Sequence, residues 1–274
     1  MNKILILIIN YSNEDEVLNY VKLISEQDLS DNIEIAIVNN KSINIDYLNE
    51  QIKKINIKCE LFDPNDNLGY LGGVLYGYEE FIKKSSNLPE WVVISNTDID
   101  INDKQFFNKL VDKTYSEDIV CIAPSVFSPA TQSYQNPHYK ERISSLKINM
   151  LIGINSIYPL AYLYENLAIM KTKLLEKNKP KSCYVYSAHG CFFILKNNFI
   201  SKISKNGYKG FMYSEESYIA ENILKYEKKC FYDSELEVIH NENAVTGLLG
   251  IKKRSKYIAN SLRFIKNEFY TNYW

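Results

Sequence analysis

The chain has few arginines, histidines and cysteines among its 274 residues. Its five cysteines lie in separate segments and never show C-x-x-C spacing, which excludes a zinc ribbon and a thioredoxin-like redox motif. Scattered cysteines of odd number favour a reducing compartment, so we expect a cytoplasmic protein. The chain also lacks an excess of charge, because 32 Lys and Arg balance 33 Asp and Glu. Without a basic surface field, we expect no nucleic-acid partner.

No hydrophobic run is long enough to span a bilayer. The longest candidate, residues 148–163, is interrupted by Asn149, Asn155 and Pro159. The apolar run at 4–9 is too short for the core of a signal peptide, and no small-residue cleavage site follows it. We therefore predict a buried first strand at this position and no membrane-spanning segment.

The first half of the sequence alternates short apolar runs with longer amphipathic segments. Runs rich in Ile and Val occur at 4–9, 33–38, 59–62, 91–94 and 119–122 and predict strands buried on both faces. Apolar residues at three-to-four spacing predict helices at 14–26, 45–54, 72–84 and 104–113. This alternation indicates an α/β fold with a mostly parallel central sheet flanked by helices, whose ligands bind at the carboxyl ends of the strands.

The second half has a different pattern. A polar stretch with three prolines precedes an amphipathic segment at 141–177, which predicts helices. Strand-like sections at 183–195 and 229–240 flank a helix predicted at 215–226, and residues 251–269 form a basic amphipathic helix. We therefore divide the chain into two halves of one domain, 1–122 and 123–247, followed by a C-terminal extension at 248–274 that forms the basic amphipathic helix.

Asn96, Thr97 and Asp98 follow the predicted strand at 91–94, with Asp100 two residues further on. Carboxylates at the end of a buried strand are suited to a hard divalent cation that also binds a substrate diphosphate. The alternative is a simple turn in which Asn and Asp bond their own backbone.

A glycine-rich segment, Asn67-Leu68-Gly69-Tyr70-Leu71-Gly72-Gly73, precedes the helix predicted at 72–84. Glycines there would let the backbone and the helix N-terminus approach a phosphate or ribose. The alternative is a tight turn with close helix packing. The pattern is not G-x-G-x-x-G, so we expect no nicotinamide cofactor.

Glu215 and Glu216 open a predicted helix after the apolar sequence Phe211-Met212-Tyr213. A carboxylate partly desolvated by these side chains would have the raised proton affinity of a general base. The alternative is compensation of the helix dipole behind Ser214 as N-cap.

Two of the three histidines adjoin predicted strands. His240 ends the apolar run at 229–240 and could bind a metal or a diphosphate, and His189 precedes Gly190 and another apolar run. A structural role is the alternative for both. His138 lies in the proline-rich stretch and has no evident role.

The order of these motifs along residues 3–247 resembles that of the family 2 glycosyltransferases of the GT-A fold, particularly bacterial enzymes of capsule, exopolysaccharide and O-antigen synthesis. The resemblance implies an inverting transfer of a sugar from a UDP- or dTDP-sugar to a glycan hydroxyl, with Mn²⁺ or Mg²⁺ as cofactor. The acceptor would be a polyprenyl-linked intermediate of a surface polysaccharide.

The resemblance implies that 1–122 is the nucleotide-sugar-binding half and 123–247 the acceptor-binding half of one GT-A domain, and it implies a role for each matching residue. These roles are nucleotide binding for Asn10, Tyr11, Asn39, Asn67, Gly72 and Asn96; metal binding for Asp98 and His240; catalysis for Glu216 with Glu215 beside it; and acceptor binding for His189 and Gly190.

Some positions depart from the family pattern. Asn39 replaces a frequent Asp, Glu216 stands where Asp is commoner, and the polar run after His240 is only partly matched. A non-catalytic carbohydrate-binding relative of the same fold is therefore the alternative function. A sugar-phosphate nucleotidyltransferase is disfavoured, because residues 10–16 contain neither glycine nor arginine.

The basic tail helix and the apolar segment at 146–163 suggest a further partner. Both could rest on an anionic membrane surface that presents a lipid-linked acceptor. The alternative is a solvated helix or one that forms a homodimer.

Overall fold

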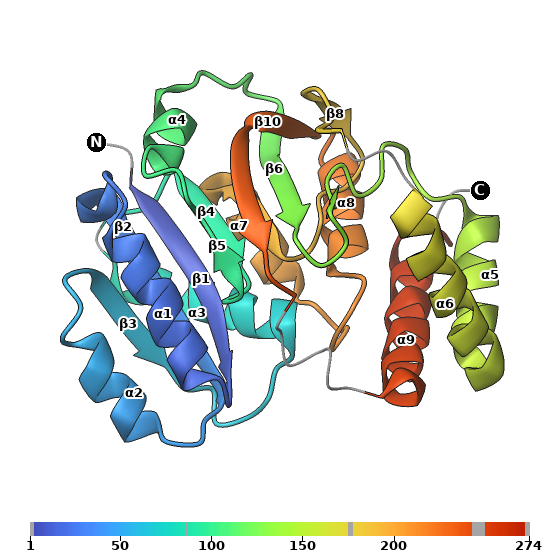
Figure 1. Ribbon diagram of the computed structural model, residues 1–274, viewed down its shortest axis with the longest axis horizontal. Helices are drawn as coiled ribbons and strands as arrows, with labels where there is room; N and C mark the ends of the chain where they lie inside the picture. The colour runs from blue at the N-terminus through green and yellow to red at the C-terminus, as the bar shows by residue number, and fades with distance from the viewer. Residues whose placement is uncertain (1–2, 86, 175–177, 243–249, 272–274) are drawn as a thin grey trace.

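The computed structural model describes residues 3–85, 87–174, 178–242 and 250–271. Within these residues the strands join in one ten-stranded sheet with helices on both faces (Figure 1). The strands are β1 Ile4–Tyr11, β2 Ile33–Lys41, β3 Lys58–Phe62, β4 Trp91–Ser95, β5 Ile99–Asp100, β6 Ile119–Ser128, β7 Ser133–Tyr134, β8 Cys183–Val185, β9 Phe192–Lys196 and β10 Lys229–His240. The helices are α1 Glu14–Ser25, α2 Ile45–Ile52, α3 Tyr70–Lys84, α4 Phe106–Asp112, α5 Ser145–Ser156, α6 Tyr158–Leu174, α7 Asn197–Asn206, α8 Glu215–Lys225 and α9 Ile251–Phe269, with a 3₁₀ turn at Ser30–Asn32.

The sheet is mostly parallel, as the sequence predicts. Its main path runs β3-β2-β1-β4-β9-β6-β10-β5. Six strands, β3, β2, β1, β4, β6 and β10, point the same way, and the central strand β9 runs antiparallel to both of its neighbours. Since β9 is reversed, its amino end lies at the same edge as the carboxyl ends of the other central strands. Polar residues from both kinds of strand end therefore meet at one edge.

The Ile- and Val-rich runs form the core on both faces of this sheet. Side chains of β1 alternate between two buried clusters, with Leu5 and Leu7 in one and Ile4, Ile6 and Ile8 in the other. Helix α3 covers the first face and α1 the second, since their apolar stripes belong to these same clusters. Continuous apolar strands of this kind are expected where helices cover both faces.

The second half departs from the prediction in detail. The section expected at 183–195 is split into β8 and β9, because residues between them turn across the carboxyl end of β4, where the Asn96 N–H donates to the Cys191 carbonyl at 2.8 Å. Helix α7 and the two-residue strands β5 and β7 were not predicted from the sequence. The strands are too short for a periodic signal, and α7 directly continues the apolar run of β9.

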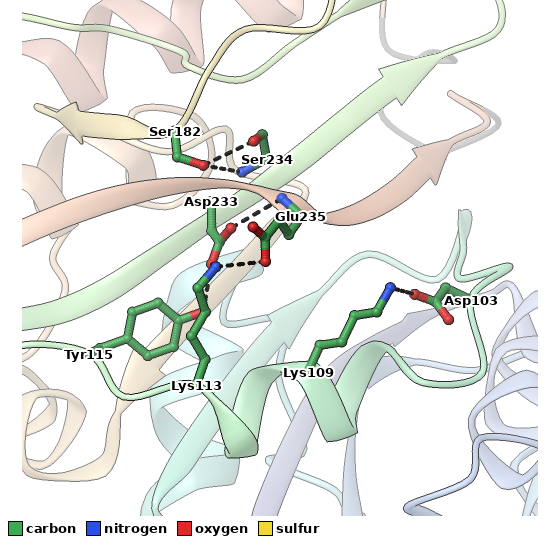
Figure 2. Close-up of polar contacts among 8 residues, drawn as sticks. All are labelled: Asp103, Lys109, Lys113, Tyr115, Ser182, Asp233, Ser234 and Glu235. Atoms are coloured by element: carbon green, nitrogen blue, oxygen red, sulfur yellow. Dashed lines mark hydrogen bonds and ion pairs between the residues drawn. The ribbon is translucent and has the colours of Figure 1, made fainter.

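A buried carboxylate fixes the bend of β10. The Asp233 side chain is fully buried (0% exposed) and accepts hydrogen bonds from Lys113 Nζ and Tyr115 Oη, both at 2.7 Å (Figure 2). Lys113 also bonds Glu235 at 3.1 Å. The register between β10 and β6 shifts between Asp233 and Glu237, so the network joins the end of α4 to this irregularity. It thereby sets the course of the strand that ends at His240.

Helices α5, α6 and α9 lie side by side at one end of the molecule (Figure 1). Helix α9 has the bounds predicted from the sequence and buries Ala259, Leu262, Ile265 and Phe269. In the part of the chain that the structure describes, no helix combines the length and the hydropathy needed to cross a membrane. The expected boundary at 122/123 falls inside β6, so both halves share that strand, and the boundary at 247/248 lies outside the described residues.

Candidate active site

A cavity of about 620 Å³ opens at the edge where the parallel strands end. Most residues singled out in the sequence line it: Tyr11, Asn67, Asn96, Asp98, His189, Gly190, Glu215, Glu216 and His240. They come from the ends of β1, β4 and β10, from the approach to β9, and from the starts of α3 and α8. The arrangement follows from the parallel sheet, which places separate strand ends side by side.

Asp98 and His240 face each other in this cavity. The Asp98 Oδ1 atom lies 3.5 Å from His240 Nε2, and both side chains are buried. Neither carboxylate oxygen of Asp98 nor His240 Nε2 has a hydrogen-bond partner among the described residues, whereas His240 Nδ1 is 2.8 Å from Gln135 Oε1. The Asp98 side chain therefore does not bond the backbone of its own turn, which was the alternative left open by the sequence. Buried polar atoms without partners are available to bind a ligand, and this oxygen and nitrogen pair suits a divalent cation.

His240 of this pair adjoins His189, which in turn adjoins His138. The ring centroids of His189 and His240 are 5.6 Å apart, and those of His138 and His189 are 5.5 Å apart. Burial is the main cause that holds the pKa of His189 well below its usual value, and the nearby His138 and His240 add to it, so this ring is neutral. His138 had no role in the sequence analysis, and its place beside His189 could not be inferred from a loop of unknown course.

Glu215 and Glu216 enter the cavity from the start of α8. Tyr213 and Ser214 before them both have left-handed backbone angles, with φ of 67° and 66°. Ser214 makes no side-chain capping bond, so the capped helix start considered in the sequence analysis is not formed. Burial, together with the charge of Glu216, raises the pKa of Glu215 to about 8. Near neutral pH Glu215 is therefore protonated.

Gly190 provides the space that Glu216 occupies. A Cβ atom at residue 190 would overlap Glu216 Oε1 and lie 3.0 Å from its carboxyl carbon. The loop before β9 therefore contacts the Glu216 carboxyl group directly.

Other glycines matter more for packing than the predicted Gly72. A Cβ at Gly69, which has φ of 72°, would overlap the Phe211 carbonyl oxygen, and one at Gly77 would overlap the Val38 side chain. Gly72 has only Leu68 within contact distance, at 3.6 Å, and does not line the cavity. The glycines of this segment are therefore better explained by close packing around α3 than by direct contact of Gly72 with a ligand.

Asn10 and Asn39 lie behind the cavity wall. Asn10 Nδ2 donates to Asn39 Oδ1 at 2.9 Å, and Asn39 Nδ2 donates to Asp63 Oδ2 at 3.0 Å. The neighbouring Asn40 lines the cavity and donates to the Gly69 carbonyl at 2.7 Å. The sequence missed Asp63, which places a carboxylate beside the Asn39 that departs from the family pattern.

Helix α9 forms one wall of the cavity, which the sequence analysis did not anticipate. Lys253, Arg254 and Tyr257 line it. Arg254 forms an ion pair with Glu165 of α6, and Ser261 Oγ donates to the Met212 carbonyl at 2.8 Å just before α8. A basic amphipathic pattern predicts a surface helix but does not indicate which basic residues turn toward a cavity.

Comparison with solved structures identifies this architecture. Neither a protein-family model nor a curated protein sequence matches the chain. Its structure is similar to that of the mannosyltransferase PcManGT from Pyrobaculum calidifontis in complex with GDP-Man and Mn²⁺, with a TM-score of 0.56, 11% identity, and coverage of 90% of this chain and 59% of that one. It is also similar to GalNAc-T7 with UDP, GalNAc and Mn²⁺, with a TM-score of 0.55, 13% identity and coverage of 98% and 50%. The chain has the GT-A fold.

A third structure, of a mycobacterial protein, has a TM-score of 0.53 at 10% identity, with 96% of this chain and 74% of that one covered. The chain thus spans only 59% and 50% of the two glycosyltransferases it resembles. At such low sequence identities the structural similarity establishes the GT-A fold alone. The activity must be argued from the residues of the cavity.

Proposed function

We propose that this protein is a metal-dependent, inverting glycosyltransferase that moves a sugar from a nucleoside-diphosphate donor to a hydroxyl group. The observation that carries the proposal is the cavity itself, where the Asp98 carboxylate and His240 Nε2, without hydrogen-bond partners among the described residues, share one space with Glu215 and Glu216. Two solved structures of the same fold are complexes, one with GDP-Man and Mn²⁺ and the other with UDP, GalNAc and Mn²⁺, which supports this class of ligand.

Asp98 and His240 are the residues that would hold the cation. The buried Asp98 carboxylate and the buried Nε2 atom of His240, neither of which has a hydrogen-bond partner among the described residues, fit Mn²⁺ and also accept Mg²⁺. When bound, the cation supplies charge neutralisation for the diphosphate leaving group. Lys253 and Arg254 add positive charge to the same cavity from α9.

Glu216 is the proposed general base. It lines the cavity, is only half-buried and contacts the loop at Gly190. Glu215, with its pKa raised to about 8, is protonated near neutral pH and is suited to donate a hydrogen bond. In this assignment the Glu216 carboxylate takes the proton of the acceptor hydroxyl, whose oxygen then attacks the anomeric carbon from the side opposite the leaving group.

The donor and acceptor would occupy different sides of this cavity. Tyr11, Asn67 and Asn96 would contact the nucleotide, with the bonded pair Asn10 and Asn39 supporting that wall from behind, and Gly72 would act only through the helix start that it shares with Tyr70. His189 and Gly190 would face the acceptor.

We further propose that the acceptor is a glycan, carried on a polyprenyl lipid at the inner face of the cell membrane during synthesis of a surface polysaccharide such as capsule or O-antigen. A homodimer is the other assembly that the apolar helices would allow. All five cysteines are free thiols, which accords with a reducing cytoplasm.

The test is release of nucleoside diphosphate from a panel of UDP-, dTDP- and GDP-sugars with Mn²⁺. We expect release from one donor. The rate of release should fall at least a hundredfold in Glu216→Gln, which keeps the shape of the side chain and removes its charge. Asp103→Asn serves as the control, because Asp103 is a surface residue paired with Lys109. Donor binding without release by the wild type, with any acceptor extract, would instead identify the non-catalytic carbohydrate-binding relative.

A further inference from the structure

Helix α6 presents its large apolar side chains to solvent. Leu160, Leu163, Tyr164 and Leu167 recur at helical spacing along one stripe, and they are 44%, 56%, 40% and 54% exposed. A helix at the surface of a soluble protein normally turns such a stripe toward the core.

The face of α6 that turns inward is small and polar instead. Ala161 is buried, and Glu165 forms an ion pair with Arg254 of α9. The neighbouring helix α9 has the ordinary orientation, with Leu262 and Ile265 buried. The outward apolar stripe is therefore particular to α6, because the neighbouring helix α9 buries its apolar side chains in the usual way.

The exposed apolar surface continues onto α5 and the turn between the two helices. Nine of the fourteen large apolar side chains that are exposed in the described part of the chain lie on α5, on α6 or at Ile157 between them, and we call these nine residues together the α5–α6 face. They are Leu146, Met150, Ile157, Tyr158, Leu160, Tyr162, Leu163, Tyr164 and Leu167. Concentration of this kind marks a surface that binds a partner.

Charge is distributed unevenly between this end of the protein and the rest. Helices α5, α6 and α9 contain nine Lys and Arg against two Glu, and the remaining sequence contains 23 Lys and Arg against 31 Asp and Glu. Arg263 of α9 lies directly beside the turn, since its Nη2 donates to Ser156 Oγ at 2.6 Å. The apolar face therefore belongs to the basic end of a protein whose other parts are acidic.

We propose that the α5–α6 face docks on the surface of an anionic lipid bilayer. Leucines would enter the boundary between headgroups and acyl chains, the three tyrosines would lie at headgroup level, and the basic residues would attract the anionic lipids. A second copy of the chain fits less well, because pairing this face with itself would bring two basic surfaces together.

Docking in this way would also place the cavity near the bilayer. Helix α9 packs against α5 and α6 and contributes Lys253, Arg254 and Tyr257 to the cavity wall. That this position would bring a lipid-linked acceptor to the cavity rests on the proposed function, whereas docking on the bilayer does not.

The experiment is co-sedimentation of the full chain with vesicles of phosphatidylcholine, with and without phosphatidylglycerol. We expect binding at least tenfold stronger with phosphatidylglycerol, a loss of at least tenfold in Leu163→Glu/Leu167→Glu, and about a tenfold loss in Lys252→Glu/Lys256→Glu. The control is Ile43→Glu/Leu88→Glu, which changes two exposed apolar residues elsewhere, 80% and 61% exposed, and should bind as the wild type does. Circular dichroism confirms that each variant is folded.

Neither donor nor metal is present in this assay, so its result is independent of the enzymatic proposal. Absence of wild-type binding to both vesicles would overturn the inference, as would equal binding by Leu163→Glu/Leu167→Glu. Light scattering provides the remaining outcome: a wild-type dimer that this same variant dissociates would show that a second copy covers the face instead.

Discussion

Gly190 lies so close to Glu216 that a Cβ atom at residue 190 would overlap the carboxylate oxygen Oε1. Gly190→Ala should therefore displace the proposed base without removing it. We expect kcat to fall about ten- to a hundredfold, because small displacements of a catalytic group are costly, while binding of nucleoside diphosphate is unchanged. Steady-state kinetics and calorimetric titration of the nucleotide measure the two effects separately.

The control for this substitution is Gly153→Ala in helix α5, where nothing lies within 4 Å of the added atom. It should stabilise the protein by about 1 kcal/mol through helix propensity and leave kcat unchanged. Full activity in Gly190→Ala would mean that the contact with Glu216 has no catalytic role.

Glu215 should make the protein less stable as the pH rises. Its pKa is raised from 4.5 to about 8 by burial and by Glu216, so the native state holds a proton that the unfolded state has released. This contribution is complete below pH 4.5 and is lost progressively up to about pH 8. Urea unfolding at pH 5 and pH 9 should show that Glu215→Gln gains stability over the wild type at the higher pH, by about 1.4 kcal/mol for each pH unit between pH 5 and about pH 8.

The matched variant is Glu50→Gln, because Glu50 is exposed on α2. Its difference from the wild type should be the same at both pH values. If Glu215→Gln behaves like Glu50→Gln, the Glu215 carboxyl group is not protonated near neutral pH in the folded protein.

The Tyr70 hydroxyl is buried in the cavity wall and has no hydrogen-bond partner among the described residues. Burial raises the pKa of Tyr70 well above 10, so the group stays an O–H donor. Tyr70→Phe should not reduce the free energy of unfolding, because it removes an unsatisfied polar atom. If the Tyr70 hydroxyl donates a hydrogen bond to the sugar nucleotide, the same variant should weaken sugar-nucleotide binding about tenfold. Unchanged binding with reduced stability would assign Tyr70 a purely structural role.

Arg142 joins the end of α9 to α8 through a buried carboxylate. It donates to both oxygens of Glu221, at 2.9 and 2.8 Å, and to the Phe269 carbonyl at 3.2 Å, while Glu221 is only 3% exposed. Arg142→Met should destabilise the protein by about 3–5 kcal/mol, because Glu221 would remain buried without its cation. Lys84→Met, which breaks the exposed pair with Glu60, should cost less than about 1 kcal/mol in the same chemical denaturation experiment. Equal effects would show that Glu221 is solvated in solution.

The parts of the fold that could be predicted are those where local pattern and tertiary position agree. The apolar runs of β1, β2 and β4 are short and rich in Ile and Val, which favours buried strands, and α9 has an amphipathic period from Ile251 to Phe269. The reversal of β9 leaves no such signal, because an apolar strand buried on both faces has the same composition in either direction.

The candidate site was predictable where residues directly follow strands or begin helices, as Asp98, His240 and Glu216 do. Arg254 and Tyr257 were missed because they come from a helix far along the chain whose packing decides which face meets the cavity. The interpretation of Gly72 as a ligand contact is not supported by its position, since the tight approaches occur at Gly69 and Gly77. Sequence spacing alone does not distinguish these neighbouring glycines.

The most direct test of the account is the metal dependence of donor cleavage in wild type and Asp98→Asn. Release of nucleoside diphosphate should rise with Mn²⁺ concentration, disappear with chelator, and fall at least a hundredfold in Asp98→Asn, in which one oxygen ligand becomes a neutral amide. The control Asp103→Asn should follow the wild-type curve. Release that is the same with Mn²⁺ and with chelator, or that survives in Asp98→Asn, would contradict the assignment of Asp98 and His240 as the metal site of a glycosyltransferase.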